Sequence, residues 1–375
     1  MVKRSKDILP NQGLAIAFIA IATVALFCTI QIVRISRSKS SPSEESRRKV
    51  EIRVYVTRDD AFFRDIADDI EDDLGILLRT VVCRSAAASR KVLSEASLAA
   101  GTVDLLILEE DRALISLREA QAIQKRFPTS ISDSLSILNP INDGFVPLYI
   151  SRAGLVYDAV ALPNPPRDWD SFNRFINENP GRFGFTAVES PAGFSFLQSL
   201  HAGLLSEHNN NSGDGSGFAG LADLKAWFEK SGKDVILTNS DYDALRLLAT
   251  GKLLIASAVE DEVLRASRDG RIHENIDMYI PDFGSSMTTI GMAMPLNTQN
   301  EEPVLALMEY LLDRDNQLRM REMLMVAPVR PGMAPPIGSL LGDYWSDPHF
   351  LPQLDGRMKA AITEQFRKEI LYGFY

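Results

Sequence analysis

From residue 50 onward, short apolar strands alternate with amphipathic helices, and this alternation constrains the fold more than any other feature. Residues 51–56 alternate apolar and polar side chains, as a half-buried strand does. Apolar side chains then recur every four residues from Phe62 to Leu74, which predicts a helix that Gly75 ends. Strands separated by helices of about ten to fifteen residues are typical of βαβ units, so we expect an α/β fold with a mainly parallel sheet.

The same reasoning places the later elements. Further helices are expected at 91–100, 113–127, 169–177, 194–205, 221–230, 242–250, 303–324 and 355–371, and further strands at 104–108, 183–187, 253–259, 278–281 and 288–295. Two apolar stretches, 145–150 and 154–160, interrupt the alternation and are separated by Ser151-Arg152-Ala153. A chain of 375 residues has room for two lobes, since a domain takes roughly 100–200 residues.

The N-terminal segment holds an uncharged run. Residues 14–33 (LAIAFIAIATVALFCTIQIV) carry no charged side chain over twenty positions, and a helix needs about 20 such residues to cross a bilayer. Basic residues before the run favour a cytoplasmic N-terminus. No A-x-A cleavage site follows it, so we expect an uncleaved anchor instead of a removed signal peptide. The expected order is a cytoplasmic region (1–13), a transmembrane anchor or uncleaved signal (14–33) and a polar linker (34–49).

Charge is spread unevenly along the chain. Residues 1–49 hold nine Lys and Arg against three Asp and Glu, whereas residues 50–375 hold 31 against 47, a net charge of −16. An acidic body argues against nucleic acid, because phosphates need a basic surface.

Motifs for catalysis or cofactors are missing. Residues 215–220 (GSGFAG) match G-x-G-x-x-G, but polar residues precede them instead of the strand that a dinucleotide site requires. Neither a G-x-S-x-G elbow nor H-E-x-x-H occurs. We therefore expect no cofactor, no metal site and no enzyme. A pair of carboxylates leaves no such pattern, so a membrane-anchored hydrolase or transferase stays open as the alternative.

Polar residues follow several of the expected strands. In open α/β sheets, ligands bind outside the carboxyl ends of strands. The candidate ligand contacts are Thr57, Arg58, Asp59, Glu109, Glu110, Ser195 at a helix start, Glu260 in the run Glu260-Asp261-Glu262, and Asp282. Asp, Thr and Ser also cap helices, so a structural role is the alternative for such residues. The acidic strand ends favour a cationic solute, because carboxylates form charge-assisted hydrogen bonds with ammonium groups.

Several segments resemble one protein family in order and spacing. They include VYVTRDDAFFRDIADDIEDDLGI (54–76), DGFVPLYISRAGLVYDAVALPNPPRDWDSF (143–172), ALRLLATGKLLIASAVED (244–261) and YIPDFGSSMTTIGMAMPLN (279–297). Over roughly residues 50–335 the chain resembles the bacterial ABC-importer solute-binding proteins, in the branch for iron, thiamine, polyamines and some sugars. The adjacent Tyr-Tyr pair typical of the ferric-ion binders is missing, which argues against iron.

The resemblance implies an α/β, two-lobed periplasmic-binding-protein-like (type II) fold with two crossing strands. The first lobe would comprise 50–149 and 285–335, the second lobe 150–284, and a C-terminal helical extension 336–375. It adds Tyr149, on the crossover, to the candidate ligand contacts.

We therefore predict the solute-binding component of an ABC import system, which binds a small solute between its lobes and delivers it to a membrane permease. The expected partners are the solute and the permease subunits, with no nucleic acid, and the expected state is a monomer. The body would lie in the periplasm or outside the cell. A ligand-sensing ectodomain is a further alternative.

Overall fold

The computed structural model describes residues 49–58, 60–135, 140–212, 221–342, 349–351, 354 and 356–370. These residues belong to one compact unit that begins at Lys49. None of the described helices is long and apolar enough to cross a membrane. The expected anchor at 14–33, the region before it and nearly all of the linker lie outside the described residues, and so does Asp59.

Strands and helices alternate along the described chain. The strands are β1 (Val50–Val56), β2 (Ile76–Val82), β3 (Leu105–Glu109), β4 (Val146–Asp158), β5 (Phe183–Thr186), β6 (Val235–Thr238), β7 (Ile255–Val259), β8 (Ile276–Tyr279), β9 (Met287–Ala293) and β10 (Ala327–Pro328). The helices are α2 (Ala61–Asp65), α3 (Ala67–Leu74), α4 (Ser85–Glu95), α5 (Arg112–Glu119), α6 (Thr129–Asp133), α7 (Trp169–Glu178), α8 (Pro191–Ser212), α9 (Leu221–Ser231), α10 (Asp241–Ala249), α11 (Glu260–Arg268), α12 (Glu301–Leu312), α13 (Arg314–Leu324) and α14 (Gly356–Glu369), with a 3₁₀ turn, η1, at Gly232–Asp234.

The strands are hydrogen-bonded in the order β2-β1-β3-β9-β4-β7-β5-β6, and β8 and β10 also pair with β4. β1 is parallel to β2 and β3, and β5 is parallel to β6 and β7. β4 is antiparallel to β7, β8, β9 and β10, and β9 is antiparallel to β3. The sheet is therefore mixed, with parallel strands at both ends and antiparallel strands in the middle.

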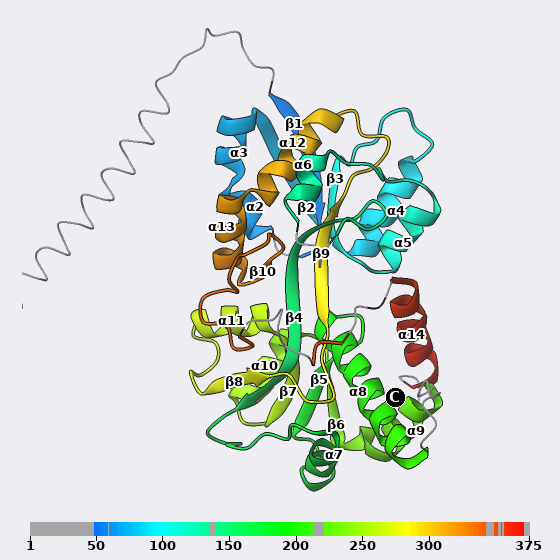
Figure 1. Cartoon of the computed structure of the whole chain (residues 1–375), viewed down its shortest axis with the longest axis vertical. Helices are drawn as coiled ribbons and strands as arrows, with labels where there is room; N and C mark the ends of the chain where they lie inside the picture. Colours follow the sequence, from blue (N-terminus) through cyan, green and yellow to red (C-terminus); the bar gives the residue numbers. More distant parts are fainter. Residues whose placement is uncertain are drawn as a thin grey trace, which may run out of the picture. The chain divides into compact units, whose positions relative to one another are not determined.

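β4 is the element that joins the two halves (Figure 1). Its residues from Val146 to Arg152 pair with β9, and those from Ala153 to Tyr157 pair with β7. Ser151-Arg152-Ala153, which separates two apolar stretches in the sequence, thus lies inside one 13-residue strand. The polar interruption marks the point where β4 changes its partners.

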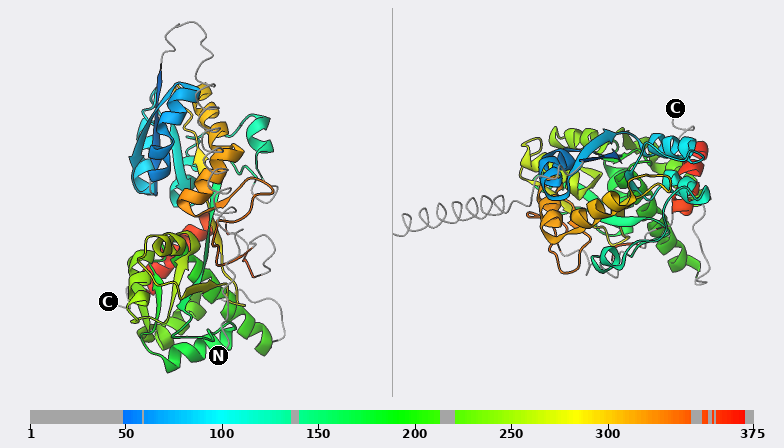
Figure 2. Two further views of the ribbon diagram at one scale, coloured as in Figure 1. Left: turned by 90° about the vertical axis from the view of Figure 1, so that its left-hand side faces the viewer. Right: turned by 90° about the horizontal axis from the view of Figure 1, so that it is seen from above.

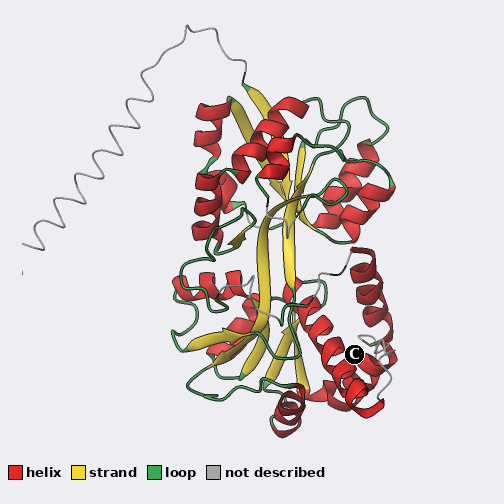
Figure 3. Ribbon diagram, viewed as in Figure 1, coloured by secondary structure: helices red, strands yellow, loops and turns green. Residues whose placement is uncertain are grey.

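Two groups of strands and helices lie on either side of this point (Figures 2 and 3). Each group has its own hydrophobic cores. We call β1–β3, β9, β10, α2–α6, α12 and α13 the first lobe, whose cores join Ile52, Leu105, Val146 and Leu307 on one face of the sheet and Val92 and Leu114 on the other. We call β5–β8 and α7–α11 the second lobe, whose main core is rich in aromatic rings. The chain passes between the lobes in β4, again between β8 and β9, and a third time between β10 and α14, whose Phe366 belongs to the second-lobe core.

Side-chain caps fix where several helices begin. Asp111 accepts hydrogen bonds from the backbone N–H groups of Ala113 and Leu114 before α5, and Asp168 accepts one from Ser171 before α7. Such caps satisfy N–H groups that have no partner within the helix. They also set the direction in which α5 leaves the end of β3.

The structure departs from the expected elements in several places. β6, at one edge of the sheet, was not expected. β2, the edge strand beside β1, was not expected, because a short apolar run does not distinguish strand from helix. α4 begins at Ser85 and ends at Glu95, earlier than the expected helix at 91–100. α5 ends at Glu119 instead of continuing to residue 127, because Gln121 takes a positive φ of 51° and Ile123 then bridges to Pro295.

Replacing Phe172 tests the aromatic core of the second lobe. Phe172 is fully buried, and its ring contacts those of Trp169, Phe183, Phe196 and Phe283. We expect Phe172→Ala to lower the free energy of unfolding by about 3–5 kcal/mol in urea denaturation. Val160→Ala, at a side chain that is 75% exposed, should change it by less than about 0.5 kcal/mol. If both changes lowered the free energy of unfolding equally, Phe172 would not be packed in the aromatic core.

Candidate functional site

A cavity of about 180 Å³ lies where the end of β1, the middle of β4 and the start of α11 meet. Its lining residues come from both lobes and from β4: Arg58, Tyr149, Leu324 and Val326 from the first lobe and the adjoining part of β4, and Asp261, Glu262 and Arg265 from the second. The cavity is therefore an inter-lobe cavity with charged walls, and we take it as the candidate site.

Arg58 spans this cavity. It follows β1, where the backbone N–H of Thr57 donates to the carbonyl of Ile107 and so holds the strand end in place. Its Nη1 lies 3.3 Å from Asp261 Oδ2 in the second lobe, and its Nε lies 3.6 Å from Glu109 Oε1 in the first. Burial opposes the charge on Arg58, but the two carboxylates outweigh it and raise the pKa of the guanidinium above its ordinary value. One guanidinium thus joins carboxylates of both lobes.

The second-lobe wall is a charged cluster on the first turn of α11. Asp261 is 1% exposed and accepts hydrogen bonds from Ser151 Oγ and from Arg265 Nη2, the latter at 3.2 Å. Arg265 also donates to Glu262 at 2.6 Å. Burial, with the neighbouring charge of Asp261, raises the pKa of Glu262, although Arg265 and Arg58 oppose this. Glu109, Asp261 and Glu262 therefore outnumber the two guanidiniums by one carboxylate, and Glu109 also lies 3.8 Å from the ammonium group of Lys359.

Tyr149 supplies a neutral polar group. It lies in β4 opposite Ile290 and Pro328 and is 5% exposed. Burial raises its pKa to about 12, with Arg58 acting in the opposite direction, so the phenol keeps its proton at neutral pH. Its hydroxyl has no hydrogen bond among the residues that the structure describes. A solute in the cavity can therefore accept from this hydroxyl or donate to it.

Asp241, at the start of α10, lies behind the charged wall. Its Oδ2 accepts a hydrogen bond from the backbone N–H of Val259 at 3.0 Å, next to the first turn of α11. Burial raises the pKa of Asp241 to about 7, and the charges of Glu262 and Asp261 add to the rise while Arg58 opposes it.

Three predicted contacts come together here, and four others (Glu110, Ser195, Glu260 and Asp282) lie elsewhere. Arg58, Glu109 and Tyr149 gather at the inter-lobe cavity. Glu110 points to Arg118, at 2.6 Å, and to Asn142, at 3.1 Å. Ser195 is 1% exposed, and its Oγ lies 3.0 Å from Ser285 Oγ and accepts from the backbone N–H of Ser286, which ties α8 to the chain before β9. Asp282 is exposed on a turn, and its backbone N–H donates to Arg167.

Glu260 has a structural environment. Its carboxylate accepts a hydrogen bond from Arg152 Nε at 2.8 Å, and both side chains are almost fully buried. It also accepts from Ser339 Oγ and from the backbone N–H groups of Leu340 and Leu341, at 2.8, 2.9 and 3.1 Å. Glu260 thus fastens the segment after β10 to the crossing strand, and its neighbour Asp261 faces the cavity instead.

Asp261, Glu262 and Arg265 were not among the predicted contacts. A signal for them does exist in the sequence, because Asp261 and Arg265 lie four positions apart and so share one helix face. Which acid of the run points into the cavity depends on where α11 starts. A pattern of charges alone does not determine that position.

Metal ligation has no obvious centre. Within the described part of the chain, no group of three or more His, Cys, Asp or Glu side chains is placed to hold a metal ion.

Sequence comparison identifies the family. A profile of the family described as bacterial extracellular solute-binding protein matches residues 67–352, about three quarters of the chain. This chain is a bacterial extracellular solute-binding protein. The match confirms the predicted function, that of a solute-binding protein of ABC importers, and the family is one of binding proteins, not of enzymes. The folded body therefore lies outside the cytoplasm, and such proteins work with a small solute and permease components. No curated protein matches the sequence.

Solved structures show the same fold. Iron-bound HitA from Pseudomonas aeruginosa is 17% identical, with a TM-score of 0.65 over 86% of this chain and 99% of that one. An ABC transporter structure from Clostridium perfringens is 13% identical, with a TM-score of 0.65 over 86% and 99%. Trichodesmium IdiA (FutA), in complex with iron and citrate, is 15% identical, with a TM-score of 0.62 over 85% and 99%. The predicted periplasmic-binding-protein-like α/β fold is thus confirmed.

The raised pKa of Asp241 predicts a pH dependence of stability. An aspartate in the unfolded chain titrates near 3.8, so between that pH and about 7 the folded protein keeps a proton that the unfolded chain has released. Stability from this group therefore falls as the pH rises through that window, by up to about 4 kcal/mol. Asp241→Asn should remove this slope, because an amide oxygen can still accept from Val259 and does not titrate.

Urea unfolding of both proteins at about pH 5 and about pH 8 gives the comparison. The pKa values of Asp111 and Glu262 are also raised, so they contribute to the pH dependence of both proteins. Subtracting the pH dependence of Asp241→Asn from that of the unchanged protein leaves the contribution of Asp241. Identical pH profiles would show that Asp241 is ionised in the folded state.

Proposed function

We propose that the inter-lobe cavity binds a small organic cation, with an ammonium or guanidinium group, and that the protein delivers it to the permease of an ABC importer. The observation that carries this proposal is the position of Arg58. Its guanidinium lies between Glu109 of the first lobe and Asp261 of the second, at 3.6 and 3.3 Å. The two carboxylates are therefore spaced for a cation of this size.

Charge and hydrogen bonding support the same class of solute. Three carboxylates, those of Glu109, Asp261 and Glu262, meet two guanidiniums and the ammonium group of Lys359, so an external cation would bind by taking the place of one of these groups. Each charge-assisted hydrogen bond to such a group contributes about 1.5–3 kcal/mol. The hydroxyl of Tyr149 offers one more contact, and the volume of about 180 Å³ suits a small solute. A bound cation would take the place of Arg58, whose side chain is 21% exposed and can turn towards water.

Movement of the lobes follows from the same contact. Arg58 and Asp261 belong to different lobes, so their ion pair closes the cavity. A solute that binds both carboxylates would hold the lobes together in its place. Hinge closure around a ligand is a known transition of periplasmic binding proteins. β4 and the passage between β8 and β9 would be the hinge.

The site differs in chemistry from a ferric-ion site of the Tyr-Tyr type. HitA and IdiA are described with iron, and iron is also a cation. In this chain, however, the residues after β7 are Glu260-Asp261-Glu262, and Asp261 and Glu262 are engaged by arginines. The carboxylates of Asp261 and Glu262 already bind guanidinium groups of the chain, which supports an organic cation as the solute more directly than a bare metal ion.

The remaining features of the proposal concern the cell. The uncharged run at 14–33 supports a single membrane anchor that keeps the body near its permease. We propose a monomer, since one chain supplies both walls of the cavity.

Native mass spectrometry after gentle purification tests the function. We expect a retained small cation, which unfolding should release intact. A panel of thermal-shift measurements should then show stabilisation by amines or guanidines and none by citrate, phosphate or ferric citrate. Stabilisation by an anion or by ferric citrate alone would reverse the assignment, and chemical turnover of the solute would favour a hydrolase or transferase.

Asp261→Asn, with Asp282→Asn as its matched control, tests the site. Both changes remove one carboxylate charge, but Asp282 is exposed and lies outside the cavity lining. For the solute found by mass spectrometry, we expect Asp261→Asn to weaken binding about 10- to 100-fold in calorimetry. Asp282→Asn should stay within about twofold of the unchanged protein, because rim charges contribute little at moderate salt. Equal losses in the two variants would mean that the effect is one of net charge only.

A further inference from the structure

The C-terminal helix α14 contacts both lobes (Figure 1). Its last turns are anchored in the second lobe, where Phe366 is fully buried with its ring 5.1 Å from that of Phe228. Ile370, just after the helix, is 3% exposed in the same core, and Arg367 forms an ion pair with Glu189. This end of α14 is therefore part of the second lobe.

The first turns of α14 reach the first lobe instead. Arg357 lies 3.2 Å from Glu119, at the end of α5, in an exposed ion pair. Lys359 points inward: its side chain is 13% exposed, and its Nζ lies 3.8 Å from Glu109 Oε2 in the first lobe and 5.2 Å from the ring centre of Phe194, on α8 in the second lobe. These contacts with the first lobe are ionic, whereas those with the second lobe are mainly apolar.

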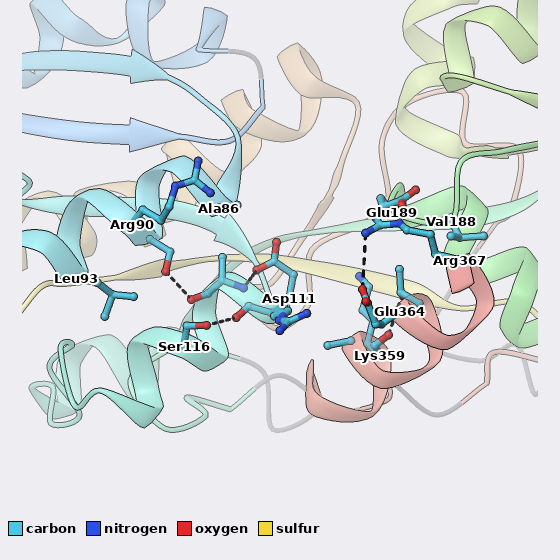
Figure 4. A pocket seen from close by; sticks show the side chains of 15 residues that line it. Ala86, Arg90, Leu93, Asp111, Ser116, Val188, Glu189, Lys359, Glu364 and Arg367 are labelled. Atoms are coloured by element: carbon cyan, nitrogen blue, oxygen red, sulfur yellow. Dashed lines mark hydrogen bonds and ion pairs between the residues drawn. The ribbon is translucent and has the colours of Figure 1, made fainter. Parts of the chain in front are cut away.

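α14 also forms one wall of a second cavity, of about 420 Å³ (Figure 4). The facing walls are α4 and the start of α5 in the first lobe, and Val188 and Glu189 in the second. In Figure 4, Lys359, Glu364 and Arg367 lie on the α14 side, across from Asp111 and Arg90. The helix thus covers one side of the space between the lobes.

Glu109 links this helix to the solute site. One of its carboxylate oxygens faces Arg58 in the inter-lobe cavity, and the other faces Lys359. The excess negative charge around the cavity is therefore met by an ammonium group that α14 supplies. A solute cation that binds Glu109 has to compete with this ammonium.

We propose that α14 is a strap across the inter-lobe space and that Lys359 is an internal competitor of the solute, a part that rests on the function proposed above. The end at Phe366 stays fixed to the second lobe. The end at Lys359 leaves the first lobe when an external cation takes Glu109. An external cation is retained only if it binds Glu109 more favourably than Lys359 does. Lys359 thereby disfavours cations that bind weakly.

Hydrogen exchange on the protein without solute tests the strap itself. Lys359→Met keeps the aliphatic stem and removes the charge, so amides at 356–362 should exchange about tenfold faster, while those at 366–370 should not change. Lys368→Met is the matched control, because Lys368 is 66% exposed and, within the described part of the chain, forms its ion pair with Glu364 on the same helix. Uniform acceleration along α14, or the same result in both variants, would show that Lys359 does not hold the helix to the first lobe.

Competition is tested with guanidinium chloride as the probe, at about 50 mM and against sodium chloride of equal ionic strength. In the unchanged protein, guanidinium should accelerate exchange at 356–362 relative to sodium, and in Lys359→Met the two salts should give equal rates. If the unchanged protein exchanges at 356–362 equally fast in both salts, Lys359 does not compete with external cations. The attachment of α14 to the first lobe would then still be tested by the exchange experiment on Lys359→Met. Neither result depends on the retained solute, so a failure of the proposed function would be seen separately, by mass spectrometry.

Discussion

The ion pair between Arg152 and Glu260 is the interaction on which the arrangement of the two lobes depends. Arg152 lies in β4 where the strand leaves β9 and joins β7, and both side chains are at most 3% exposed. Two charges so deeply buried are stable only when their remaining hydrogen-bonding groups are satisfied. Ser339, Leu340, Leu341 and the carbonyl of Gly342 provide these partners. The pair therefore fixes three segments at once: the crossing strand, the start of α11 and the chain after β10.

With this point fixed, the contacts that can change lie away from it. Arg58 and Asp261 meet across the cavity, and Lys359 meets Glu109 at its edge. Both contacts join the lobes through ionic groups that water can reach in part, so a solute or a salt ion can replace them. The apolar contacts of Phe366 offer no such exchange, because separating them exposes ring surface to water. In the proposed movement of the lobes, the chemistry of each contact thus decides whether it stays fixed or can be exchanged.

The α/β fold and most strand positions could be predicted, because they follow from apolar periodicity and from the order of segments. β4 shows the limit of this reasoning: Ser151-Arg152-Ala153 is a polar break by pattern, yet the strand continues through it because Glu260, 108 positions later, pairs with Arg152. The site could be predicted in part for the same reason. Strand ends located Arg58 and Glu109, whereas the roles of Glu260 and Asp261 depend on how α11 is rotated. No local signal connects Lys359 with Glu109, since the two are brought together only when α14 packs on the second lobe.

Tertiary contacts decide how much of the negative charge of residues 50–375 is available to a solute. A net charge of −16 over residues 50–375 suggests an acidic cleft, but the carboxylates at the cavity already form ion pairs with arginines. Arg58 and Arg265 leave an excess of one carboxylate among Glu109, Asp261 and Glu262, and Lys359 meets it. Any external cation therefore gains the difference between its own contacts and those of the group that it replaces, not the full attraction of the carboxylates. The proposed site would therefore discriminate by shape and hydrogen-bond geometry, because a bare positive charge is already provided by the chain.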